Sequence, residues 1–192
     1  MKLINCSLIV FFSIFLLATF THASDDSYSE TIAVFSKSDA VKPFFDEAYG
    51  YAVFPTVGKG GIILGGAYGA GRVFLKEKVS GTASLMKVSI GLQLGGQAFS
   101  EIIFFEDERA YNEFTSENFE FDGSLSAVVI TAAAQAQSST KGNTAGASLG
   151  PATGTQAETS YTKGMAVFIH TLGGLMCEMS VGGQKFSFTP TK

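Results

Sequence analysis

Residues 50–76 read GYAVFPTVGKGGIILGGAYGAGRVFLK, and this glycine-rich apolar stretch decides the fold. In a helix, Gly61, Gly65 and Gly69 would share one face at four-residue spacing, as in helices that pack inside membranes. In strands, the glycines would mark turns, bulges and close backbone contacts. Each glycine in a helix interior costs about 1 kcal/mol relative to alanine, and Arg72 interrupts the apolar run. The stretch is therefore predicted to form strands.

The next apolar segment, residues 86–94, alternates strictly between two kinds of side chain. Methionine, valine, isoleucine and leucine lie on one face, and lysine, serine, glycine and glutamine lie on the other. This alternation is typical of a half-buried strand, and it predicts that Met86 and Val88 face the core. Gly95-Gly96 is predicted to turn the chain into a return strand, residues 97–105, which is apolar enough to be covered on both faces.

The other elements follow from periodicity and turn chemistry. Two short helices are predicted within residues 29–48, with Asp39 capping the second and Pro43 straining it, and Asp107 is predicted to cap a third. The other predicted strands are 51–54 (ended by Pro55), 61–68, 72–76, 119–121, 125–135, 162–171, 174–181 and 184–188. Residues 58–61 are predicted to form a turn or an open loop. The other predicted turns are 69–71, Asp122-Gly123, Leu172-Gly173 and Gly182-Gly183. The predicted class is α+β: a mostly antiparallel sheet, sandwich or barrel-like, with short N-terminal helices and one mid-chain helix.

The N-terminus, residues 1–23, has the pattern of a secretory signal peptide. Lys2 precedes an apolar run, and Thr21-His22-Ala23 offers a cleavage site after Ala23. A retained signal anchor is the alternative. Cys6 precedes the apolar run, whereas a lipoprotein acylation site would follow it, so no lipid-anchored cysteine is predicted. We expect an exported protein, periplasmic or secreted, with one domain over residues 24–192 and a flexible Ser/Thr/Gly-rich loop near residues 138–158.

Charge and cysteine content narrow the class further. Without residues 1–23 the chain keeps 12 of its 13 basic residues and all 17 acidic ones, which argues against a nucleic-acid-binding protein. The basic residues gather in residues 37–87 and the acidic ones in residues 101–122, which suits either an anionic partner or ordinary solubility. Cys177 is then the only cysteine, so no internal disulfide forms, and its apolar neighbours predict burial.

Few residues of the chain carry catalytic chemistry. His170 is the only histidine after residue 23, which excludes a histidine cluster for a metal, and we interpret it as structural. Glu101 and Glu178 lie within apolar strands and are predicted to face outward, since a buried carboxylate would be strongly perturbed. The glycines of residues 58–61 could cradle a phosphate, although any glycine-rich turn has this pattern. No catalytic residue, metal or cofactor is predicted; the remaining enzyme hypothesis pairs His170 with Glu178 or Asp122.

Several glycine-rich motifs together resemble the SYLF domain. They run in the family's order from about residue 29 to about residue 189: 48–55, 58–61, 65–69, 91–97, 163–167, 173–175 and 182–186. The resemblance implies lipid binding, notably to phosphoinositides and other anionic lipids in eukaryotic members, some of which also bind and bundle actin. The family also includes secreted bacterial proteins. This chain departs from the eukaryotic members in its predicted signal peptide and in having no second interaction domain such as SH3. An exported member would meet no cytoplasmic actin, so actin binding is not expected here.

The sequence thus predicts a non-enzymatic domain that binds an anionic phospholipid or a phosphoinositide-like lipid at a membrane surface. Basic side chains near an anionic bilayer gain about 1 kcal/mol each. The predicted lipid-binding residues are Lys37, Lys42, Lys59, Arg72 and Lys76. The alternative is a structural or protein-interaction domain of the cell envelope.

Overall fold

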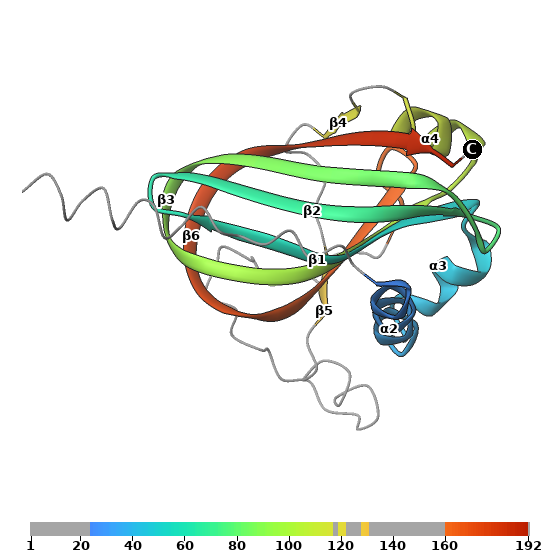
Figure 1. Ribbon diagram of the computed structural model, residues 1–192, viewed down its shortest axis with the longest axis horizontal. Coiled ribbons are helices and arrows are strands. Elements are labelled where there is room, and N and C mark those ends of the chain that lie inside the picture. Colours follow the sequence, from blue (N-terminus) through green and yellow to red (C-terminus); the bar gives the residue numbers. More distant parts are fainter. Residues whose placement is uncertain (1–23, 117–118, 122–127, 131–159, 192) are drawn as a thin grey trace, which may run out of the picture.

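A computed structural model of the chain describes residues 24–116, 119–121, 128–130 and 160–191 (Figure 1). Its elements are α2 (Asp25–Ser36), α3 (Lys42–Glu47), β1 (Gly50–Gly61), β2 (Leu64–Leu75), β3 (Lys78–Phe105), α4 (Glu108–Phe114), β4 (Phe119–Phe121), β5 (Val128–Ile130) and β6 (Met165–Pro190). The predicted signal peptide, the Asp122-Gly123 turn, the loop near 138–158 and the side chain of Cys177 lie outside the described part.

The described strands form one six-stranded sheet in the order β1-β2-β3-β6-β4, with β5 beside β6. All pairs are antiparallel except β5 with β6. The predicted α+β class is confirmed, as are the strands expected within residues 50–76. The sheet is open, rather than a two-sheet sandwich or a closed barrel.

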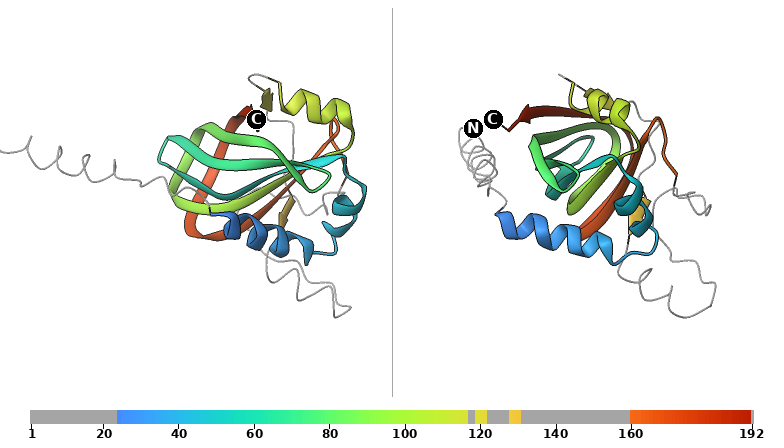
Figure 2. Two further views of the ribbon diagram at one scale, coloured as in Figure 1. Left: turned by 45° about the vertical axis from the view of Figure 1, so that its right-hand side comes forward. Right: turned by 90° about the vertical axis from the view of Figure 1, so that its right-hand side faces the viewer.

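Two strands are far longer than predicted, because Gly95-Gly96 and Gly182-Gly183 do not turn the chain. Gly95-Gly96 lies within β3 and Gly182-Gly183 lies within β6. These two strands pair with each other in antiparallel orientation over most of their lengths. Gly95 has a φ of 122°, which L side chains rarely adopt. Glycines within strands permit sharp bends, and here the long strands curl around the β1–β2 hairpin (Figure 2). The prediction of a turn at Leu172-Gly173 is also wrong, because both residues lie within β6.

The boundaries predicted for β1 and β2 are also wrong. Pro55 does not end β1 but lies where its pairing register shifts, a position where a missing N–H is tolerated. Residues 58–61 belong to β1 and residues 69–71 to β2, so neither segment is a turn. The β2–β3 turn instead uses Lys76 and Glu77, with φ of 47° and 67°. This left-handed backbone forms a hairpin turn without the usual asparagine or glycine signal.

Two apolar cores lie on opposite faces of the sheet. The core inside the curl is formed by the sheet and α4, and includes Phe54, Phe105, Phe114 and Phe186. The core outside the curl lies under α2 and α3. Residues 99–105 are buried throughout, which confirms that this segment is covered on both faces.

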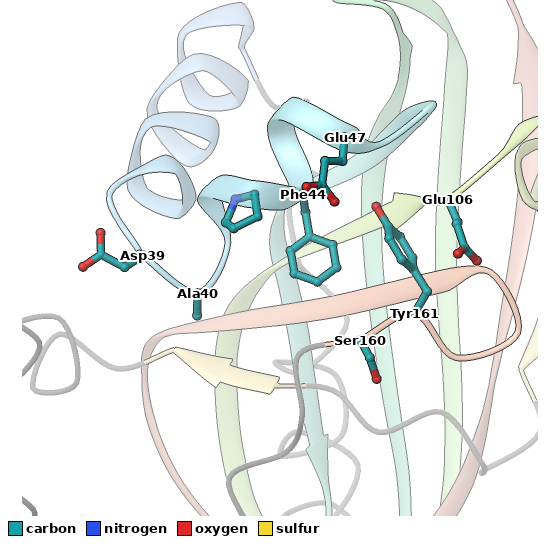
Figure 3. Close-up of a pocket in the computed structure, with 8 residues that line it drawn as sticks. Asp39, Ala40, Phe44, Glu47, Glu106, Ser160 and Tyr161 are labelled. Atoms are coloured by element: carbon teal, nitrogen blue, oxygen red, sulfur yellow. The ribbon is translucent and has the colours of Figure 1, made fainter.

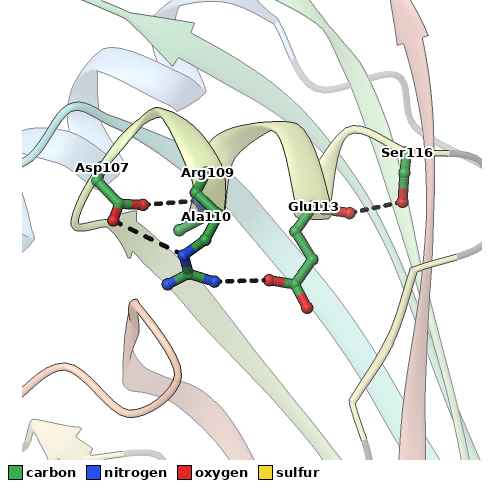
Figure 4. Close-up of polar contacts among 5 residues, drawn as sticks. All are labelled: Asp107, Arg109, Ala110, Glu113 and Ser116. Atoms are coloured by element: carbon green, nitrogen blue, oxygen red, sulfur yellow. Dashed lines mark hydrogen bonds and ion pairs between the residues drawn. The ribbon is translucent and has the colours of Figure 1, made fainter.

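Helix α4 begins where the sequence predicts. The Asp107 side chain accepts a hydrogen bond from Ala110 N at 2.8 Å, and Arg109 pairs with Glu113 at 3.1 Å (Figure 4). Asp39, in contrast, does not cap α3. The helix begins at Lys42 with Val41 as its N-cap, since Pro43 is tolerated only in a first turn.

Candidate membrane-binding surface

The five predicted lipid-binding residues do not gather on one surface. Lys37 follows α2, Lys42 begins α3, and Lys76 lies in the β2–β3 turn, all at the end of the sheet opposite the β1–β2 turn (Figure 1). Lys42 pairs with Asp39 at 2.8 Å. Lys59 alone lies close to the β1–β2 turn, half-buried in β1.

Arg72 attaches α2 to the sheet. Its guanidinium lies 4.4 Å from the ring centroid of Tyr28, and its Nη1 lies 2.6 Å from Asp25 Oδ1. Tyr28 is buried, whereas the Asp25 side chain is 86% exposed. An exposed ion pair contributes little, whereas a partly desolvated cation–π contact contributes about 0.5–2 kcal/mol. The aromatic contact is therefore the stronger of the two.

We expect Arg72→Met to loosen α2 while preserving the aliphatic packing of the side chain. Loss of about 1 kcal/mol raises the population of the detached helix about fivefold. Hydrogen exchange across residues 25–36 measures this change, and Asp25→Asn is the matched variant that removes only the ion pair. An equal acceleration in both variants would contradict the dominance of the Tyr28 contact.

Large apolar side chains are exposed at the β1–β2 turn. Ile62, Ile63 and Leu64 are 67%, 65% and 68% exposed. On the adjoining outer face, Tyr68 pairs with Met86 across β2 and β3, and Val88 lies opposite Gly66; all three side chains are exposed. We call these six residues the apolar end. Exposed apolar residues grouped in this way make the apolar end a candidate interaction surface.

The outward direction of Met86 and Val88 corrects the sequence-based prediction for this strand. Leu85 and Ser89 are buried and Lys87 is half-buried, so the polar side of the alternation faces into the curl. Alternation separates two faces of a strand but does not say which one is covered. The available signal for the apolar end was the Ile62-Ile63-Leu64 run itself, since turns rarely carry three large apolar residues.

Basic side chains lie near the apolar end, and two acidic residues also lie close to it. Glu120 pairs with Lys185 at 3.2 Å, and Glu178, whose side chain is outside the described part, lies opposite Gln93 in the β3–β6 pairing. The described residues 58–70, 82–89, 95–100 and 183–188 include no aspartate or glutamate. Their basic residues are Lys59, Lys87 and Lys185. The opposite end holds many carboxylates: Asp39, Asp46, Glu47, Glu106, Asp107, Glu108 and Glu113.

Glu101 faces inward, which corrects the prediction that it points to solvent. Its side chain lies on the same face of β3 as those of Phe99 and Ile103, and it is fully buried. Gln184 Nε2 donates to its Oε2 at 3.4 Å, while Oε1 has no hydrogen-bond partner. Burial raises the pKa of Glu101 to about 7, against the opposing effects of the Lys87 charge and the Gln184 hydrogen bond. The side chain of Glu178 lies outside the described part.

His170 packs edge-on against Phe35, with ring centroids 6.4 Å apart, in keeping with a structural interpretation. Among the described residues, no three histidine, cysteine or acidic side chains are placed to hold a metal. Over the same residues, none of the helices combines the length and the apolar character needed to cross a membrane.

Comparison with known proteins finds Beta cell expansion factor A of Aeromonas veronii, 26% identical over 157 residues. The match covers 81% of this chain and 51% of the relative, so this chain spans about half the length of that protein. No family model and no solved structure matches the chain.

Proposed function

We propose that this protein binds anionic membrane surfaces, non-enzymatically, by inserting the apolar end among the lipid headgroups. The observation that supports this most directly is the exposure of Ile62, Ile63 and Leu64 at the β1–β2 turn, with Lys59 and Lys87 on the strands close to it. We also propose that the chain is exported and that it is related to the SYLF domain, as its sequence predicts.

Magnitudes favour the apolar contact over the electrostatic one. Burying one large aliphatic side chain contributes about 1.5–3 kcal/mol, whereas a lysine near an anionic surface contributes about 1 kcal/mol. The three turn residues together therefore outweigh Lys59, Lys87 and Lys185. The lysines would add a preference for anionic lipid and orient the β1–β2 turn toward it.

The five basic residues predicted from the sequence to bind lipid have different roles in this proposal. Lys59 belongs to the surface that would meet the membrane. Arg72 holds α2, and Lys37, Lys42 and Lys76 lie at the far end of the sheet, so we no longer expect these four to contact lipid directly.

Ile63→Ser is expected to weaken vesicle binding about tenfold. The substitution removes most of one inserted aliphatic side chain, and 1.4 kcal/mol corresponds to a factor of ten. Co-sedimentation of the chain from Ser24 onward with phosphatidylcholine vesicles, with and without phosphatidylglycerol, measures the partition coefficient. Residues 1–23 are omitted because their apolar run would itself enter a bilayer.

Val79→Ser is the matched control for this experiment. Val79 is also an exposed apolar strand residue, but it lies near the β2–β3 turn at the other end of the sheet. We expect its partition coefficient to be unchanged. Equal weakening by both substitutions, or no binding to either vesicle, would overturn the proposal and favour a protein partner for the apolar end.

A further inference from the structure

A cavity of about 440 Å³ opens between the α2–α3 connection, α3, the end of β3 and the segment that precedes β6 (Figure 3). This volume lies within the range of small-molecule sites. The residues that decide its chemistry are Asp39, Pro43, Phe44, Glu47, Glu106 and Tyr161.

One wall of the cavity is aromatic and held in place. Phe44 is almost fully buried. Its ring centroid lies 5.1 Å from that of Tyr161 and 5.0 Å from that of Phe168, and both contacts are edge-on. Phe104 packs on the same ring at 5.6 Å. Neighbours on several sides thus fix the orientation of the wall before any ligand arrives.

Two carboxylates lie beside the aromatic wall. Glu47 and Glu106 flank Tyr161 (Figure 3). Neither carboxylate forms an ion pair with another described residue. Asp39 is set apart from these two and pairs with Lys42. The cavity therefore combines an aromatic wall with two carboxylates.

The hydroxyl of Tyr161 is a buried polar group that lacks a partner. Its oxygen is inaccessible to solvent and makes no hydrogen bond. Burial, with the charges of Glu106 and Glu47, raises the pKa of Tyr161 to about 12. A buried hydroxyl without a partner costs roughly 1–3 kcal/mol, so this side of the Tyr161 ring is a polar feature at the edge of the cavity.

We propose that this cavity binds a small alkylammonium ion, with its alkyl groups on the rings of Phe44 and Tyr161 and its charge beside Glu47 and Glu106. Aromatic faces attract ammonium groups, and adjacent carboxylates add a Coulombic attraction. A metal ion is disfavoured here, since rings and two carboxylates make a poor ligand set.

The alkylammonium group could belong to a free metabolite or to a lipid headgroup. The cavity is lined by residues of α3. Helix α3 lies at the end of the sheet opposite the β1–β2 turn (Figure 1). A membrane bound at the apolar end would not reach it, so we assign the site to a free cation. The cavity and its preference for an ammonium group do not depend on the proposed membrane function, whereas the assignment to a free cation rests on it.

Titration of the full chain with choline, ethanolamine and the neutral choline isostere 3,3-dimethylbutan-1-ol tests the proposal. Nuclear magnetic resonance of ring-labelled tyrosine follows the Tyr161 signal, which is assigned with Tyr161→Phe. We expect saturable shifts with at least one ammonium compound and binding of the isostere at least about tenfold weaker. Glu47→Gln is expected to weaken ammonium binding about fivefold to tenfold.

Asp46→Asn is the matched control, because Asp46 is an exposed carboxylate on α3 that does not line the cavity. It should leave binding unchanged. Failure of both ammonium compounds, equal binding of the isostere, or equal weakening by Asp46→Asn would overturn the proposal. Shifts that occur with phosphatidylcholine vesicles and not with free choline or ethanolamine would overturn the assignment to a free cation.

Discussion

Glu101→Gln is expected to stabilise the protein by about 3 kcal/mol at about pH 8 and to change its stability little at about pH 4. In the folded protein the pKa of Glu101 is raised from 4.5 to about 7 by burial. The folded state therefore holds a proton that the unfolded chain releases above about pH 4.5. Between these two pKa values the free energy of unfolding of the wild type falls as pH rises, by about 1.4 kcal/mol per pH unit.

Urea unfolding of both proteins at a series of pH values measures this effect. Glutamine resembles the protonated carboxyl, so the difference between the two proteins isolates Glu101 from every other titrating group. Glu120→Gln is the control, since that carboxylate is 65% exposed and its pair with Lys185 contributes about 0–1 kcal/mol. A stability difference that stays constant across pH would contradict the buried, protonated state of Glu101.

Gly71→Ala is expected to destabilise the protein by about 2–3 kcal/mol, and to lower its melting temperature by roughly 5–10 °C. A Cβ at this position would lie 2.5 Å from Phe54 Cδ1 and 2.6 Å from the carbonyl oxygen of Val53. The second contact is with backbone, so a side-chain rotation cannot relieve it. The register between β1 and β2 shifts between Val53 and Thr56, which shows that β1 bulges opposite Gly71.

Gly66→Ala provides the comparison within the same strand. Gly66 lies on the exposed face of β2, and the nearest atom to an added Cβ is the Lys87 carbonyl oxygen at 3.9 Å. Replacing a strand glycine by alanine there should be neutral or slightly stabilising, since it reduces the entropy of the unfolded chain. Similar melting temperatures for the two variants would argue against the close approach of β1 and β2 at Gly71.

The candidate surfaces were only partly predictable from the sequence. The strict alternation over residues 86–94 identified a strand with two unlike faces, and the described part of that strand has them. It could not identify the outer face, because a shift of one residue exchanges the faces of any strand. Burial of the apolar side is the usual outcome, so Met86 and Val88 were predicted inside and Glu101 outside.

The alkylammonium cavity had no sequence signal at all. Its walls come from residues 39–47, from Glu106 and from residues 160–161, which are far apart along the chain. The individual residues are an ordinary phenylalanine, a tyrosine and two glutamates. Only the packing of α3 beside the end of β3 and the segment before β6 brings the rings and carboxylates around one space.

The sequence by itself determined that residues 50–76 form strands, that Asp107 begins a helix, and that the class is α+β. These are local properties, set by helix propensity, capping and side-chain period over a few residues. The tertiary structure decided what each glycine pair does. Because glycine permits a turn, a bulge or an extended strand equally well, only the long-range pairing of β3 with β6 keeps Gly95-Gly96 and Gly182-Gly183 within continuous strands. That pairing curls the sheet and leaves the residue 62–64 turn exposed at one end.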